Sequence, residues 1–133
     1  MTNLRCITHK KTKREIDTLV KTYNTYKLDT TEVICADSDF TSYCRRVEFY
    51  ADQRDELVKV IVRYDSVTAH KDASFYFERG FLIKVEATPS ENRSHTAIYY
   101  KQDLPLKKRH RRNDAFRSWK NEAQFYYEMF SKQ

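Results

Sequence analysis

Apolar and polar residues alternate with a period of two through the middle of the chain, from Tyr43 to about Arg111. This alternation is typical of β-strands that bury one face. The predicted strands cover residues 44–50, 57–64, 73–78, 81–87, 95–101 and 104–111. A short β-branched segment, TEVICA at 31–36, predicts a further strand before them.

Both ends of this region have a helical period instead. Residues 12–28 predict an amphipathic helix, and Thr12 and Glu15 have the spacing of a capping box at its start. Residues 113–132 predict a second helix whose broad apolar stripe includes Trp119 and Tyr127. A stripe with so many rings must be covered, and the sheet offers the only large apolar surface.

Three segments have similar patterns of an aromatic or apolar group, a turn and a lysine. They are FYFERGFLIKV (75–85), IYYKQDLPLKK (98–108) and VEFYADQRDELVKV (47–60). We interpret them as three tandem β-hairpins. Gly80, the only glycine, is predicted to lie in the tightest turn, where a positive φ is needed.

These elements predict one α+β domain spanning residues 1–133. Its expected architecture is a curved antiparallel β-meander of about six strands, with the N-terminal and C-terminal helices packed on one face.

Charge is concentrated in two short runs. The net charge is +6, and residues 1–14 and 107–112 each carry five positive charges, whereas residues 15–106 are acidic overall. Such runs bind phosphates or simply remain solvated, and we favour solvation. No apolar run is long enough to span a membrane, and residues 1–15 lack the apolar core of a signal peptide.

Candidate catalytic groups are few. VICADSDFT (33–41) resembles the first motif of haloacid-dehalogenase-type phosphatases, which would make Asp37 the nucleophile and Asp39 the acid. That family requires a parallel sheet, which the meander excludes. Glu48 and Glu86 on the wetter sheet face form a conceivable acid pair. Cys6 with His9, and the separate His70, His95 and His110, have no partners at metal-site or catalytic spacing. We therefore predict no enzymatic activity, metal or cofactor.

Cys35 and Cys44 flank a polar loop nine residues apart. They would form a disulfide in an oxidising compartment and buried thiols in the cytosol.

A row of tyrosines and lysines is the candidate binding surface. Its members, from equivalent positions of the hairpins, are Tyr76, Tyr99, Lys59, Lys84 and Lys107. If exposed, they would fit an acidic partner protein or a single nucleic-acid strand. The alternative, which we favour, is ordinary cross-strand packing in which lysine stems cover rings.

The hairpin unit resembles small domains of secreted proteins and lipoproteins of Bacteroidetes, and is similar to hairpin repeats of antitoxin-like and MORN-type proteins. The resemblance covers about residues 12–111. It implies a periplasmic or extracellular location and an interaction role, with the cytoplasm as the alternative.

The expected function is therefore non-enzymatic binding of another protein or an envelope component through the curved sheet. One alternative is a small-molecule-binding or catalytic cone of the nuclear-transport-factor-2-like type, which needs a pocket between sheet and helices. The other is a nucleic-acid binder that uses the two basic runs.

Overall fold

A computed structural model of the chain describes residues 12–37, 42–64, 72–88, 96–101, 104–105 and 114–133. The elements, in chain order, are α2 (Lys13–Tyr23), β1 (Leu28–Asp37), β2 (Ser42–Ala51), β3 (Leu57–Tyr64), β4 (Asp72–Glu78), β5 (Phe81–Thr88), β6 (Thr96–Lys101), β7 (Leu104–Pro105) and α4 (Asp114–Ser131).

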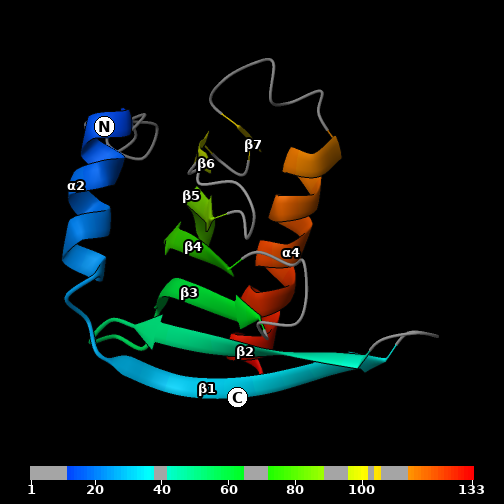
Figure 1. Ribbon diagram of the computed structural model, residues 1–133. Coiled ribbons are helices and arrows are strands. Elements are labelled where there is room, and N and C mark those ends of the chain that lie inside the picture. Colours follow the sequence, from blue (N-terminus) through cyan, green and yellow to red (C-terminus); the bar gives the residue numbers. More distant parts are fainter. Residues whose placement is uncertain (1–11, 38–41, 65–71, 89–95, 102–103, 106–113) are drawn as a thin grey trace.

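The strands form an open antiparallel meander in which sequential strands are neighbours (Figure 1). β7 adds a two-residue pairing with β6. The predicted α+β class and the antiparallel meander with a helix at each end are confirmed. The first helix ends at Tyr23 rather than at 28.

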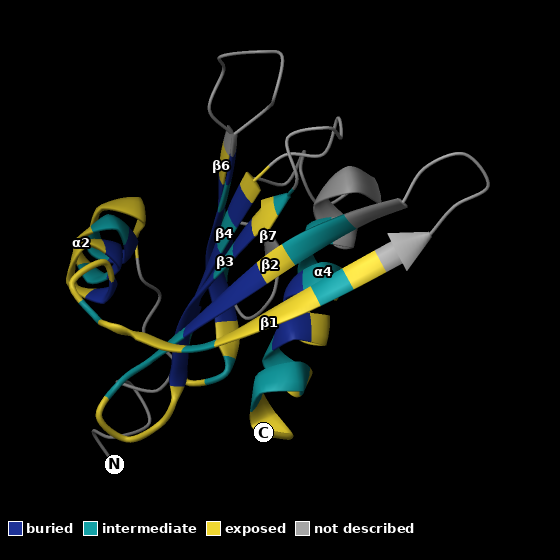
Figure 2. Ribbon diagram, turned by 60° about the horizontal axis from the view of Figure 1, so that its bottom comes forward, coloured by how far each residue is buried: buried dark blue, intermediate teal, exposed yellow. Residues whose placement is uncertain are grey.

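The two helices lie on opposite faces of the sheet, so the prediction that both pack on one face is wrong (Figure 1). The face under α2, which we call the α2 face, buries a small cluster that includes Val58, Tyr76 and Ile83. The opposite face, the α4 face, buries the larger core (Figure 2). Successive residues of a strand point to opposite faces, so Phe75 and Phe77 join the α4 core while Tyr76 meets α2.

Aromatic rings fill the space between α4 and the sheet. Trp119 and Tyr126 lie 5.8 and 5.5 Å from Phe75, measured between ring centroids. Phe130 lies 5.6 Å from Phe49, and Tyr127 lies 5.4 Å from Phe77. The centre of this layer is therefore packed with side chains contributed by the helix stripe.

Turns and caps follow local chemistry. Thr12 and Glu15 form the predicted capping box. Arg79 and Gly80 both have positive φ, as a two-residue hairpin turn requires, and the prediction for Gly80 is confirmed. A Cβ at Gly80 would lie 3.2 Å from the hydroxyl of Tyr127, so glycine also leaves room for α4.

Candidate binding surface

Two β-bulges decide which side chains reach the α2 face. In the β2–β3 pair, Lys59 lies opposite Tyr50 and Leu57 opposite Ala51, so Val58 is an extra residue. The β4–β5 pair has the same irregularity, with Ile83 as the extra residue beside Lys84. A bulge interrupts the alternation of a strand. As a result, the apolar extra residue and the lysine after it both contact α2 or its C-cap in each hairpin.

The bulges align a continuous cross-strand row. Each member lies directly opposite the next on the neighbouring strand, in the order Tyr50, Lys59, Tyr76, Lys84 and Tyr99. The structure thus brings together four of the five predicted binding residues and adds Tyr50. Lys107 lies outside the described residues. Tyr76, Lys59 and Lys84 are buried and Tyr99 is half-buried, so the row is a packed layer rather than a free surface.

Lys59 illustrates this packing. Its ammonium donates to the side-chain oxygen of Asn24, the C-cap of α2, at 3.1 Å, and lies 4.3 Å from the centroid of the Tyr50 ring. Burial lowers the pKa of Lys59, against the opposing effect of the Glu48 charge. The arrangement is that of a lysine whose stem and head cover an aromatic neighbour.

Lys84 joins the sheet to α2 through Asp17. Its ammonium is 2.8 Å from Asp17 Oδ1, which also accepts a 2.7 Å hydrogen bond from the Tyr99 hydroxyl. Partial burial opposes ionisation of Asp17, but the hydrogen bonds from Lys84 and Tyr99 outweigh it, and the pKa of Asp17 is lowered. Burial likewise opposes the charge of Lys84, yet the bond to Asp17 and the charge of Glu86 raise its pKa.

We expect Asp17→Asn to lower the melting temperature by roughly 1–4 °C near neutral pH, since this partly exposed pair is screened by solvent. The folded pKa of Asp17 lies below its unfolded value of about 3.9. The stabilisation is therefore present above about pH 4 and is lost as the pH falls through the folded pKa. Thermal melts between neutral and strongly acidic pH test this. Asp29→Asn, at an exposed carboxylate of β1, should cause a smaller change throughout.

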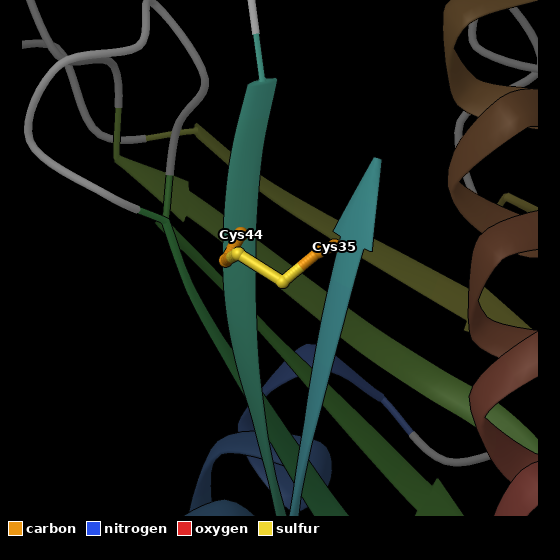
Figure 3. Close-up of a disulfide and its surroundings, with 2 residues drawn as sticks. All are labelled: Cys35 and Cys44. Carbon is orange, nitrogen blue, oxygen red and sulfur yellow. A yellow bond between two sulfur atoms is a disulfide. The ribbon is translucent and has the colours of Figure 1, made fainter. Parts of the chain in front are cut away.

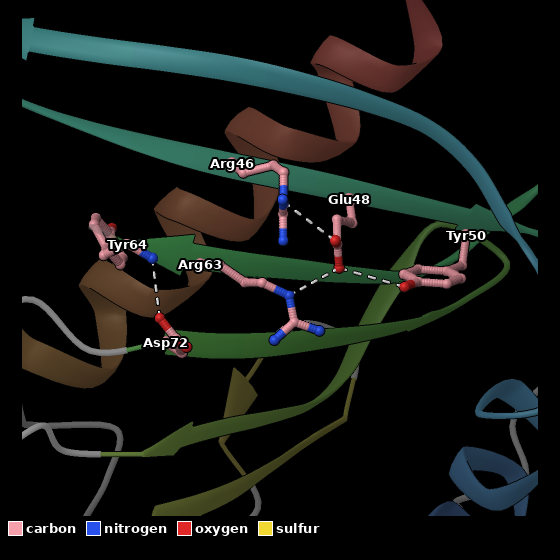
Figure 4. Close-up of polar contacts among 6 residues, drawn as sticks. All are labelled: Arg46, Glu48, Tyr50, Arg63, Tyr64 and Asp72. Carbon is pink, nitrogen blue, oxygen red and sulfur yellow. Dashed lines mark hydrogen bonds and ion pairs between the residues drawn. The ribbon is translucent and has the colours of Figure 1, made fainter. Parts of the chain in front are cut away.

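Beyond this row, the α2 face carries a charged cluster that sequence reasoning missed. Arg46 and Arg63 lie directly opposite each other on β2 and β3. Their Nε atoms are 3.3 and 3.2 Å from the carboxylate of Glu48, which also accepts a 3.4 Å hydrogen bond from Tyr50 (Figure 4). The Glu48 side chain is 11% exposed, whereas those of Arg46 and Arg63 are 55% and 46% exposed. We call Arg46 and Arg63 the arginine pair.

Other candidate residues do not form sites. Glu48 and Glu86 share one cross-strand row with Ile61 and Ser74 between them. Three strand spacings amount to roughly 14 Å, beyond the carboxylate separations of glycosidases. The antiparallel sheet contradicts the parallel one that the phosphatase resemblance of Asp37 requires. No metal-ligating cluster occurs within the described residues. Outside those residues lie Cys6, His9, Asp39, His70, His95, His110 and the run at 107–112.

Cys35 and Cys44 are joined by a disulfide in the structure. They are directly opposite each other on β1 and β2, and the bridge links the two strands (Figure 3). Of the two alternatives left open by the sequence, the structure contains the bridge.

Comparisons with family models, curated proteins and solved structures find no match to this chain. Within the described residues, neither helix combines the length and hydropathy needed to cross a membrane.

Proposed function

We propose that this chain is a non-enzymatic binding domain whose arginine pair binds an acidic segment of a partner protein. The observation that carries the proposal is the placement of Arg46 and Arg63 directly opposite each other on a partly exposed sheet face. Like charges in directly opposed positions destabilise a sheet. Glu48 supplies one negative charge for two guanidinium groups, so an anionic ligand would complete the neutralisation.

The geometry also leaves donors for such a ligand. Glu48 is contacted through the Nε atom of each arginine. The terminal nitrogens belong to side chains that are about half exposed, which makes them accessible to a further carboxylate. Guanidinium groups match planar carboxylates with paired hydrogen bonds, so two of them side by side favour closely spaced acidic side chains.

A protein ligand agrees better with the surroundings than a nucleic acid does. Glu48 and Glu86 lie on the same face and repel any dense row of negative charges, so the arginine pair suits a segment with a few acidic side chains better than a chain that carries a phosphate at every nucleotide. The aromatic layer under α4 supports a binding domain over a cone, because rings occupy the region where a cone has its cavity. The Cys35–Cys44 bridge supports the expected extracytoplasmic location, since disulfides persist in oxidising compartments.

The test is fluorescence anisotropy at low salt with a labelled peptide that carries a short cluster of glutamates between neutral residues. We expect the Arg46→Ala/Arg63→Ala variant to bind at least tenfold more weakly than the unaltered chain, because each charge-assisted hydrogen bond contributes about 1.5–3 kcal/mol. The charge-matched control is Arg54→Ala/Lys132→Ala, at exposed positions in the β2–β3 turn and after α4. Its affinity should remain within about twofold of the unaltered chain.

Three results would reject the proposal. The peptide could fail to bind at low salt, or both double variants could weaken binding equally. A single-stranded oligonucleotide of the same charge could instead bind more tightly and depend on the arginine pair, which would favour the nucleic-acid alternative.

A further inference from the structure

β1 forms one edge of the described sheet and has few of the features that normally protect an edge. It is ten residues long, and its register with β2 is continuous from Thr30 to Asp37. Figure 2 shows β1 beside β2, with no described strand on its other side. It contains no proline, lysine or arginine. Natural edge strands are commonly shortened, bulged or blocked by such residues. A long regular edge presents a row of backbone donors and acceptors to a further strand.

Exposed apolar groups lie on both faces next to this edge. Val33 is 64% exposed and lies opposite Arg46, hence on the α2 face. On the other face, Ile34 packs against the α4 core and lies opposite Arg45. The ring of Phe125 on α4 is 6.0 Å from the guanidinium carbon of Arg45 and is 46% exposed. A strand added at this edge would cover Val33 with the side chains on one of its faces, and Ile34 and Phe125 with those on the other.

The charged residues of β1 indicate which kind of strand can pair with it. Asp29, Glu32 and Asp37 are the only charged residues of β1. Two copies of β1 paired with each other would place six carboxylates in one ribbon, and like charges across strands are unfavourable. A strand with basic side chains would be attracted instead. Glu32 is exposed, with a 3.5 Å contact from the Gln133 side chain.

We propose that β1 accepts an antiparallel strand from a partner protein with the sequence pattern apolar, β-branched, basic. The apolar side chain lies opposite Ile34 and covers Phe125, the β-branched side chain lies beside Val33, and the basic side chain meets Glu32. The order follows from antiparallel pairing, in which residues opposite positions 34, 33 and 32 succeed one another along the partner. Val33 adjoins Arg46, but the contacts proposed for the added strand involve neither arginine, so either proposal can fail without the other.

The probe is a labelled peptide with the sequence lysine-threonine-leucine-valine-lysine-threonine-lysine. Its binding is measured by fluorescence anisotropy. Two further peptides carry N-methyl groups on alternate backbone amides. One is methylated at the odd-numbered residues and the other at the even-numbered residues. Alternate residues of a strand direct their amides to opposite edges, so only one set should abolish binding. Equal binding by all three peptides would overturn the proposal, because contact would then not involve strand pairing.

Side-chain variants test the position. Phe125→Ala should weaken binding at least threefold, whereas Phe81→Ala, at a phenylalanine of nearly equal exposure, should not. Glu32→Lys should weaken binding of the lysine peptide about tenfold. The same variant should bind a peptide that has glutamates in place of the lysines, which the unaltered chain should bind poorly. Glu56→Lys, in the β2–β3 turn, is the charge-matched control. Loss of binding in the controls, or a dimer of the unaltered chain that Phe125→Ala dissociates, would overturn the proposed occupant.

Discussion

Replacing Phe75 by alanine should lower the free energy of unfolding by about 3–5 kcal/mol, the range observed when a fully buried ring is removed from a core. Phe75 is completely buried on β4, in the middle of the sheet, between the rings of Trp119 and Tyr126. Its removal leaves a cavity under α4 that a packed aromatic layer fills poorly. Domains of this size have total stabilities of about 5–15 kcal/mol, so the variant should be close to its unfolding limit at room temperature.

Urea unfolding followed by tryptophan fluorescence measures this effect, because Trp119 is the only tryptophan and contacts Phe75. Phe81→Ala is the matched control. Phe81 is 48% exposed at the start of β5, and its removal should cost less than about 1 kcal/mol. Similar losses in the two variants would contradict the location of the main core on the α4 face.

The sequence was sufficient to predict the elements and their antiparallel order, because the hydrophobic period changes from helical to two and back. The sequence did not predict which side chains and which helix lie on each face of the sheet. Strict alternation along residues 57–64 would place Val58 on the same face as Val60, but the bulge after Leu57 moves Val58 to the other face. Nothing in a single sequence marks such an extra residue. Because simple alternation leaves only one sheet face apolar, it places both helices on that face.

The candidate site shows the same limit. Lys59 and Lys84 were predicted to be equivalent, and both lie after a bulge. Their ammonium groups bond to Asn24, the C-cap of α2, and to Asp17 in the middle of that helix, and no strand pattern identifies these residues as partners. The opposition of Arg46 and Arg63 depends on the register between β2 and β3. The only available signal was the alternation of Arg46 with Glu48, which is common in exposed strands.

The disulfide joins β1 and β2 next to the end of the described β2–β3 pairing. Among the described residues the β2–β3 pairing begins at Arg45, so Cys44 and Cys35 belong to a part of the β1–β2 ribbon that no described strand extends. Two-stranded ribbons are marginally stable in water. A covalent link at this point holds β1 in register with β2 and therefore maintains the edge to which we assign strand binding. The bridge and the proposed edge function are thus linked through one strand.

Replacing both cysteines by serine should destabilise the domain by about 2–3 kcal/mol, the loop-closure contribution for cysteines nine residues apart. Reduction of the unaltered protein should produce the same loss, and the double variant should not respond to the reductant. Hydrogen exchange should show the greatest loss of protection in β1, whereas β4 and β5 at the centre of the sheet should lose no more protection than the fall in global stability accounts for. Unchanged stability on reduction, or uniform loss of protection across all strands, would contradict a bridge that acts mainly by holding the edge strand in place.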